Sequence, residues 1–149
     1  PNDIYYVFCV QEELGCRGSK PAAERIRPDI GVAVDISPAH DYPCDLEGSN
    51  EVDGGIGIKI CDPSVVCDED VVQAMLACCE EHQIPCQREV IDKGGTDASS
   101  MNLSGVGVRV GGIVVVTRYP HSQSAVVSKK DIEAGIDLIS AFSQYEFPF

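Results

Sequence analysis

Apolar positions occur in short blocks along the chain, and several of these blocks have the pattern of buried strands. IYYVFCV at 4–10 and DIGVAVDI at 29–36 are continuous apolar runs, which are typical of strands covered on both faces. Three further strands are predicted, GIGIKICD at 55–62, QREVI at 87–91 and VGVRVGGIVVVTRY at 106–119, the last being one strand or a bent pair.

Segments with helical spacing separate these strands. The clearest covers 68–83, where acidic residues fill the first turn and suit the positive end of the helix dipole. Shorter helices are predicted over 17–26 and after the glycines of 94–103, and a last one over 129–142. Prolines, glycines and acidic residues make 37–55 a long loop. This order predicts an α/β fold, with a mostly parallel sheet in a layered domain.

Composition and charge narrow the function. The 149 residues, 44% hydrophobic and 23% charged, suit one globular domain. A net charge of −13 argues against nucleic-acid or anionic-membrane partners and favours cations. No apolar stretch approaches the roughly 20 residues of a membrane span, and the first residues do not form a signal peptide.

The eight cysteines include no CxxC pair. Cys78 and Cys79 are neighbours in a helical pattern, and Cys9 and Cys61 lie inside apolar runs, as small buried hydrophobic residues do. We therefore expect free thiols and a cytoplasmic location, with a disulfide or a metal role as the alternatives.

Chemistry-bearing side chains follow the predicted strands. Glu12 and Glu13 end the first strand, Asp35 nearly ends the second, and His121 follows the last one. Ligands usually bind at the carboxyl ends of strands in α/β sheets, so these side chains are expected to share one cleft. Carboxylates and a histidine suit zinc, cobalt or manganese, and a further carboxylate is needed as general base.

Each of these residues also has a purely structural interpretation. The glutamate pair is compatible with a solvated surface, Asp35 with a turn or a helix cap, and His121 with an ordinary loop. His40 and His82 are interpreted as structural, the first in the long loop and the second at a helix end. Only the conjunction of the four residues at strand ends favours a site.

Four segments in order carry a family resemblance: VFCVQEELGCRGSKPAA, PDIGVAVDIS, KGGTDASSM and TRYPHSQSAVV. They resemble the C-terminal half of the M42 metallo-aminopeptidases, the glutamyl and tetrahedral aminopeptidase group, some of whose members are labelled endoglucanases. The resemblance implies a zinc-peptidase-like three-layer fold with helices on both faces of the sheet. It also implies a peptide substrate, two divalent metal ions (zinc or cobalt), and a large homo-oligomer for the parent protein.

The same resemblance assigns roles to individual residues. Glu12 matches the family's general base, Glu13 and His121 match ligands of one metal ion, and Asp35 matches a ligand of the other. The family's GGTDA loop, which lines the site, corresponds to Gly94, Gly95, Thr96 and Asp97. That loop also has a structural interpretation, a glycine turn in which Thr96 or Asp97 caps the next helix, and the two do not exclude each other.

The resemblance also implies differences from the complete family site. In the family, a histidine ligand and a metal-bridging aspartate precede the glutamate pair, whereas Asp3 has no matching context. We therefore expect residues 1–149 to be the C-terminal portion of the catalytic domain, incomplete at its N-terminal side. The N-terminal portion and the inserted β-domain would be absent. Metal binding would be weak or absent, and the chain inactive alone.

Two other classes of function remain open. Paired carboxylates also serve glycoside hydrolysis, which would make the parent protein an endoglucanase. A relative that kept the fold as a non-catalytic binding or scaffold protein is the second alternative.

Overall fold

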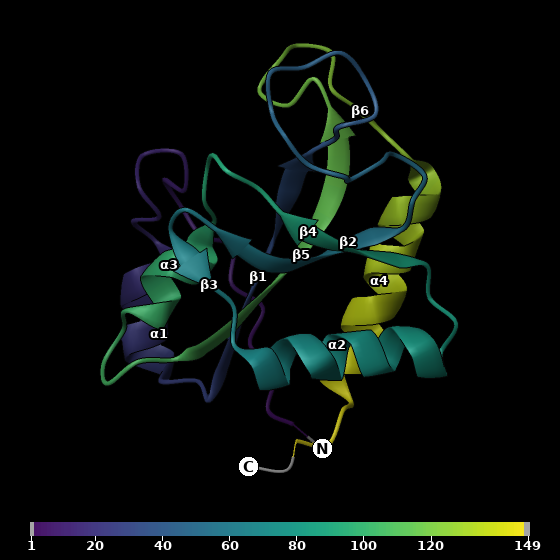
Figure 1. Cartoon of the computed structure of the whole chain (residues 1–149). Coiled ribbons are helices and arrows are strands. Elements are labelled where there is room, and N and C mark those ends of the chain that lie inside the picture. Colours follow the sequence, from purple (N-terminus) through teal and green to yellow (C-terminus); the bar gives the residue numbers. More distant parts are fainter. Residues whose placement is uncertain (1, 148–149) are drawn as a thin grey trace.

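A six-stranded mixed sheet forms the centre of the computed structural model, which describes residues 2–147 (Figure 1). The elements follow in the order α1 (Ser19–Ile26), β1 (Ile30–Pro38), β2 (Ile56–Asp62), β3 (Val65–Val66), α2 (Glu69–Glu81), β4 (Cys86–Val90), α3 (Asp97–Asn102), β5 (Arg109–Arg118), β6 (Val126–Val127) and α4 (Lys129–Ser143).

Strands of both directions pair in this sheet. β1 runs parallel to β5, and β2 runs parallel to β4. The central pair, β2 and β5, is antiparallel, and the short strands β3 and β6 pair antiparallel with β2 and β5. The expected α/β sheet with helices is confirmed, and its two long parallel pairs are joined through an antiparallel centre.

Helices cover both faces of the sheet, as Figure 1 shows. α2 and α4 pack over β2 and β5, where Ile56, Met75 and Leu138 belong to the larger core cluster and are fully buried. On the other face α3 packs against β1 and β5, with Ala98 and Val110 in the smaller core cluster, and α1 packs on α3. The layered arrangement leaves the carboxyl ends of β1 and β5 side by side.

Local sequence signals account for the helix ends. The Asp68 carboxylate accepts hydrogen bonds from the amides of Asp70 and Val71 at 3.1 and 3.3 Å, so it caps α2. Ser128 caps α4 by accepting a 3.2 Å hydrogen bond from the amide of Lys130. These caps confirm the helices predicted near 68–83 and 129–142.

The prediction of a buried first strand at 4–10 is wrong. These residues form no strand, and their large apolar side chains are exposed, with Phe8 97% accessible. A strand exists only where its backbone groups pair with a neighbour, and this run pairs with no strand among residues 2–147. Apolar side chains such as these are usually buried, but no part of the described chain covers them.

Two other expectations concern the thiols and the membrane. All eight cysteines are free thiols, as the sequence predicts. No helix within residues 2–147 has both the length and the apolar character needed to cross a membrane.

Candidate functional site

A cleft of about 640 Å³ brings together the predicted base, the three predicted metal ligands and the two glycines of the predicted loop, but its lining does not include Thr96 or Asp97. Asp35 lies on β1 opposite Val114 of β5, and His121 follows the end of β5, so the parallel pairing of these strands places both at one edge. The cleft is lined by Glu12, Glu13, Gly15, Cys16, Asp35, Ile36, Pro38, Ser64, Ile91, Gly94, Gly95, Ser99, Ser100, Leu103, Pro120 and His121.

A tight turn presents the two glutamates. The carbonyl of Glu12 accepts hydrogen bonds from the amides of Gly15 and Cys16 at 2.9 and 2.8 Å, and the Gly18 amide donates to the Val10 carbonyl at 3.0 Å. A Cβ at Gly18 would lie 2.6 Å from the Val10 nitrogen. This close approach requires glycine, and it folds the chain back so that both carboxylates enter the cleft.

Glu13 and His121 face each other across the cleft entrance. The Nδ1 of His121 lies 3.4 Å from Oε1 of Glu13, and the side chains are 70% and 74% exposed. One comes from the turn before α1 and the other from the loop between β5 and β6, so only the fold joins them. An imidazole and a carboxylate at this separation can bind a divalent cation together.

Glu12 and Asp35 lie deeper in a field of negative charge. Burial raises the pKa of Glu12 above its ordinary value, and the charge of Asp35 raises it further. Burial also raises the pKa of Asp35, against a 2.7 Å hydrogen bond from the Ile36 amide, and the charge of Asp97 adds to the increase. The described lining contains no lysine or arginine, so its carboxylates repel one another, and the charge of Lys59, which lies outside the lining, offsets only part of the increase at Asp35.

This donor set fits a divalent metal ion in part. Glu13 and His121 supply an oxygen and a nitrogen, the ligand types that zinc and cobalt accept, and the carboxylates of a lining without lysine or arginine favour a cation. Within residues 2–147, however, no three histidine, cysteine, aspartate or glutamate side chains converge closely enough to form a metal cluster. The described chain therefore contributes a pair of donors, with Asp35 apart from them.

The glycine loop before α3 both lines the cleft and caps the helix, the two interpretations considered from the sequence. Gly94 and Gly95 line the cleft, and Gly94 has a left-handed φ of +89°. Thr96 caps α3 by accepting a hydrogen bond from the Ala98 amide at 3.3 Å. Asp97 points elsewhere, accepting a 2.6 Å hydrogen bond from the Ser19 hydroxyl. The loop thus joins the wall of the cleft to the start of α1.

Sequence reasoning did not single out part of the cleft wall. The thiol of Cys16 donates a hydrogen bond of 3.5 Å to Oε1 of Glu12, the candidate base. Ser99 follows the glycine loop on α3, a position that the family resemblance alone could have indicated. Ser64, Ile91 and Leu103 come from separate segments, and nothing in the local pattern marks them.

The two remaining histidines have structural positions. Nδ1 of His40 accepts a 3.2 Å hydrogen bond from the Asn50 amide inside the long loop, and His82 ends α2. Neither lines the cleft. Their structural interpretation agrees with these positions.

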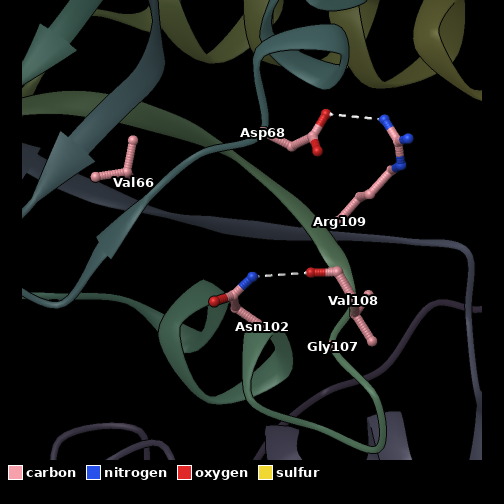
Figure 2. A pocket seen from close by; sticks show the side chains of 6 residues that line it. All are labelled: Val66, Asp68, Asn102, Gly107, Val108 and Arg109. Atoms are coloured by element: carbon pink, nitrogen blue, oxygen red, sulfur yellow. Dashed lines mark hydrogen bonds and ion pairs between the residues drawn. The ribbon is translucent and has the colours of Figure 1, made fainter.

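A second, smaller hollow of about 300 Å³ lies between the start of α2 and the end of α3. Figure 2 shows that its polar groups are already used: the Asp68 carboxylate pairs with Arg109 at 3.4 Å, and the Asn102 amide donates to the Val108 carbonyl at 3.0 Å. It contains none of the residues singled out from the sequence, so the larger cleft is the candidate site.

Known proteins are similar to this chain over most of its length. The chain is 38% identical over 138 residues to an Acetivibrio thermocellus protein that is named as an aminopeptidase by inference. The match covers 93% of this chain and 42% of that protein. Among solved structures, an aminopeptidase of the archaeon Desulfurococcus kamchatkensis matches with a TM-score of 0.88 and 34% identity, over 94% of this chain and 41% of that one.

A further solved structure is the TET1 peptidase of Pyrococcus horikoshii, described as assembling into a tetrahedron or a large octahedral shell. It matches with a TM-score of 0.78 and 28% identity, over 91% of this chain and 39% of that one. The chain thus spans about two fifths of the length of the relatives that it matches. The model of the M42 glutamyl aminopeptidase family matches residues 1–138. The chain belongs to the M42 glutamyl aminopeptidase family.

Proposed function

We propose that this chain supplies one part of the active site of a metal-dependent aminopeptidase. The observation that carries the proposal is the 3.4 Å approach of His121 Nδ1 to Glu13 Oε1, with Glu12 in the same cleft. Residues from distant parts of the sequence meet there, and their roles in this proposal are those that the resemblance to the M42 family implies.

Each side chain has a distinct task in this proposal. Glu13 and His121 would hold one divalent ion, zinc or cobalt, and Asp35 would be a ligand of a second. A bound ion polarises the scissile carbonyl and lowers the pKa of an attacking water. Glu12 accepts the proton from that water and passes it to the leaving amine. Burial, and after it the charge of Asp35, raises the pKa of Glu12, and an increase in this direction makes the carboxylate a better proton acceptor.

The substrate in this proposal is a peptide with a free N-terminus. The wall formed by Gly94, Gly95 and Ser99 is neutral and lies beside the acidic group, so it can accommodate the first residue of a peptide. The carboxylates favour the positively charged α-amino group. The parent protein would assemble into a large homo-oligomer, which the shell-forming TET1 peptidase supports by analogy.

With only the Glu13–His121 donor pair in place, we expect the 149-residue chain alone to bind metal weakly and to hydrolyse peptides poorly. Hydrolysis of an aminoacyl-anilide by the purified chain, at a rate that depends on Glu12, would contradict this part of the proposal.

A glycoside hydrolase is less well supported. Its mechanism needs two carboxyl groups facing each other across the scissile bond, and it assigns no task to a histidine placed against one of them. The family match to an aminopeptidase family also favours peptide hydrolysis.

Direct metal binding tests the proposal. Isothermal titration with Co²⁺ and Zn²⁺ should show binding to the wild-type chain that Glu13→Gln and His121→Ala each weaken at least about tenfold. His82→Ala is the matched control, because it removes a histidine at the end of α2 outside the cleft. Equal affinities for wild type and His121→Ala would rule out the assigned ligand pair.

A further inference from the structure

The loop that carries His121 has an unusual backbone. Tyr119 and His121 have φ values of 57° and 56°, on either side of Pro120. Residues other than glycine rarely adopt this left-handed conformation, and they keep it only when the surrounding structure holds them there. Something outside this turn must therefore fix its conformation.

Contacts inside the turn close it but do not orient it. The Ser122 hydroxyl donates to the Tyr119 carbonyl at 2.6 Å, and the Ser122 amide donates to the same carbonyl at 3.3 Å. These bonds join residues that are already close in sequence. They leave the direction of the turn relative to β1, and hence the direction of His121, to be set by other contacts.

The long loop after β1 supplies such contacts. The guanidinium of Arg118 donates two hydrogen bonds to the two carboxylate oxygens of Asp41, at 2.9 and 2.5 Å. The ring of Tyr42 packs edge-on against Tyr119 at 4.8 Å, and its hydroxyl accepts from the Tyr119 amide at 3.4 Å. We name these four residues the β1–β5 latch.

The loop side of the latch is itself anchored. The Ala39 amide donates to the Thr117 carbonyl at 2.9 Å, which continues the contact between β1 and β5. Asp41 also accepts a 3.2 Å hydrogen bond from the Val52 amide, and Arg118 is the last residue of β5. A two-pronged pair of this kind fixes direction as well as distance, unlike most surface ion pairs.

From these contacts we propose that Asp41 and Tyr42 are positioning residues, which hold the Tyr119–His121 turn so that His121 faces Glu13. Neither side chain lines the cleft, so each acts through Arg118 and Tyr119. The expected effect of these residues on metal affinity rests on the function proposed above. Their expected effect on the conformation of the turn is independent of that function.

The first measurement is made on the metal-free chain by ¹H–¹⁵N NMR. Asp41→Asn and Tyr42→Phe should shift or broaden the amide signals of residues 119 and 121–122, and Asp41→Glu should restore them in part. Asp53→Asn is the matched control, because it removes another exposed acid of the same loop, one paired with Lys130 at 3.2 Å. Unchanged signals for residues 119 and 121–122 in Asp41→Asn would overturn the proposal.

The second measurement is Co²⁺ affinity. Asp41 contacts Arg118 and not His121, so we expect Asp41→Asn to weaken binding about tenfold, the lower end of the range for direct partners of metal ligands, and Asp53→Asn to leave it within about twofold. If Asp41→Asn disturbs the turn while the wild-type chain binds no Co²⁺, the positioning role stands and the proposal that the Glu13–His121 pair binds metal in this chain alone fails. If Co²⁺ binds and Asp41→Asn leaves its affinity unchanged, the positioning role is overturned.

Discussion

The ammonium group of Lys59 lies 3.0 and 2.9 Å from the two carboxylate oxygens of Glu89, and both side chains are fully buried. Asp62 places a third oxygen 3.1 Å from the same nitrogen, and the Ser37 hydroxyl donates to Glu89. The cluster joins β1, β2 and β4 through one cation, so removal of that cation leaves two buried carboxylates with hydrogen bonds but no opposite charge.

We therefore expect Lys59→Met to destabilise the chain by about 3–5 kcal/mol, the usual cost of breaking a buried ion pair from one side. Urea unfolding followed by circular dichroism measures this change. Lys130→Met, which removes an exposed partner of Asp53, is the control and should change stability little. Similar losses in the two variants would show that burial does not amplify the Lys59 interaction.

Stability at acid pH should depend on Asp62. Burial acts to raise the pKa of this carboxyl, but hydrogen bonds from the Ser64 hydroxyl and amide and the charge of Lys59 outweigh it, so the pKa lies below the ordinary 3.8. Its contribution is therefore present above pH 3.8 and is lost as the pH falls through the lower folded value. The difference in unfolding free energy between wild type and Asp62→Asn should narrow below pH 3.8, and a constant difference would contradict this.

Cys67 should limit stability at alkaline pH. Burial raises the pKa of its thiol from 9.0 to about 11, because the thiolate is poorly solvated there. The folded state therefore keeps a proton that the unfolded chain releases, and stability decreases from pH 9.0 to about 11. Cys67→Ala should lose less stability than wild type over this range. Cys44→Ala, at a half-buried thiol of the long loop, is the control and should lose as much stability as wild type between these pH values. Equal losses in Cys67→Ala and Cys44→Ala would contradict the prediction.

The turn that carries Glu12 and Glu13 should lose its closed conformation if Gly18 gains a side chain. In Gly18→Ala, the new Cβ would meet the Val10 nitrogen and oxygen at 2.6 and 2.7 Å, so the turn must open. Trypsin should then cut after Arg17 faster than in wild type. Gly105→Asn is the control, because that left-handed position has open space around it and asparagine tolerates it. Equal cleavage rates would mean that the turn adapts.

Asp35 and His121 could be placed at the candidate site from sequence because their positions depend on strand ends, whereas Glu12 and Glu13 follow no strand. Asp35 and His121 lie near the ends of apolar runs, and β1 and β5 do pair in parallel, so the expected shared edge exists. The caps Asp68 and Ser128 follow local rules, and the predicted helices match closely.

What could not be predicted depends on partners distant in sequence. The run at 4–10 has the composition of a strand, but composition does not supply a neighbour for it. The left-handed conformations of Tyr119 and His121 are held from outside the turn, by a loop whose course no pattern of apolar residues defines. The two-residue strands β3 and β6 are too short to show any periodicity.

The parallel register of β1 with β5 also has a consequence for how sequences of this kind can diverge. Asp35 pairs with Val114 within an unbroken ladder, and side chains alternate between the two faces of a strand. One residue inserted into β1 ahead of Asp35 would turn its carboxylate to the opposite face. Residues inserted near the exposed Asp45 and Glu47 would instead lengthen an excursion of the loop between β1 and β2, outside both strands. Length variation among descendants should therefore collect in that excursion and spare both strands.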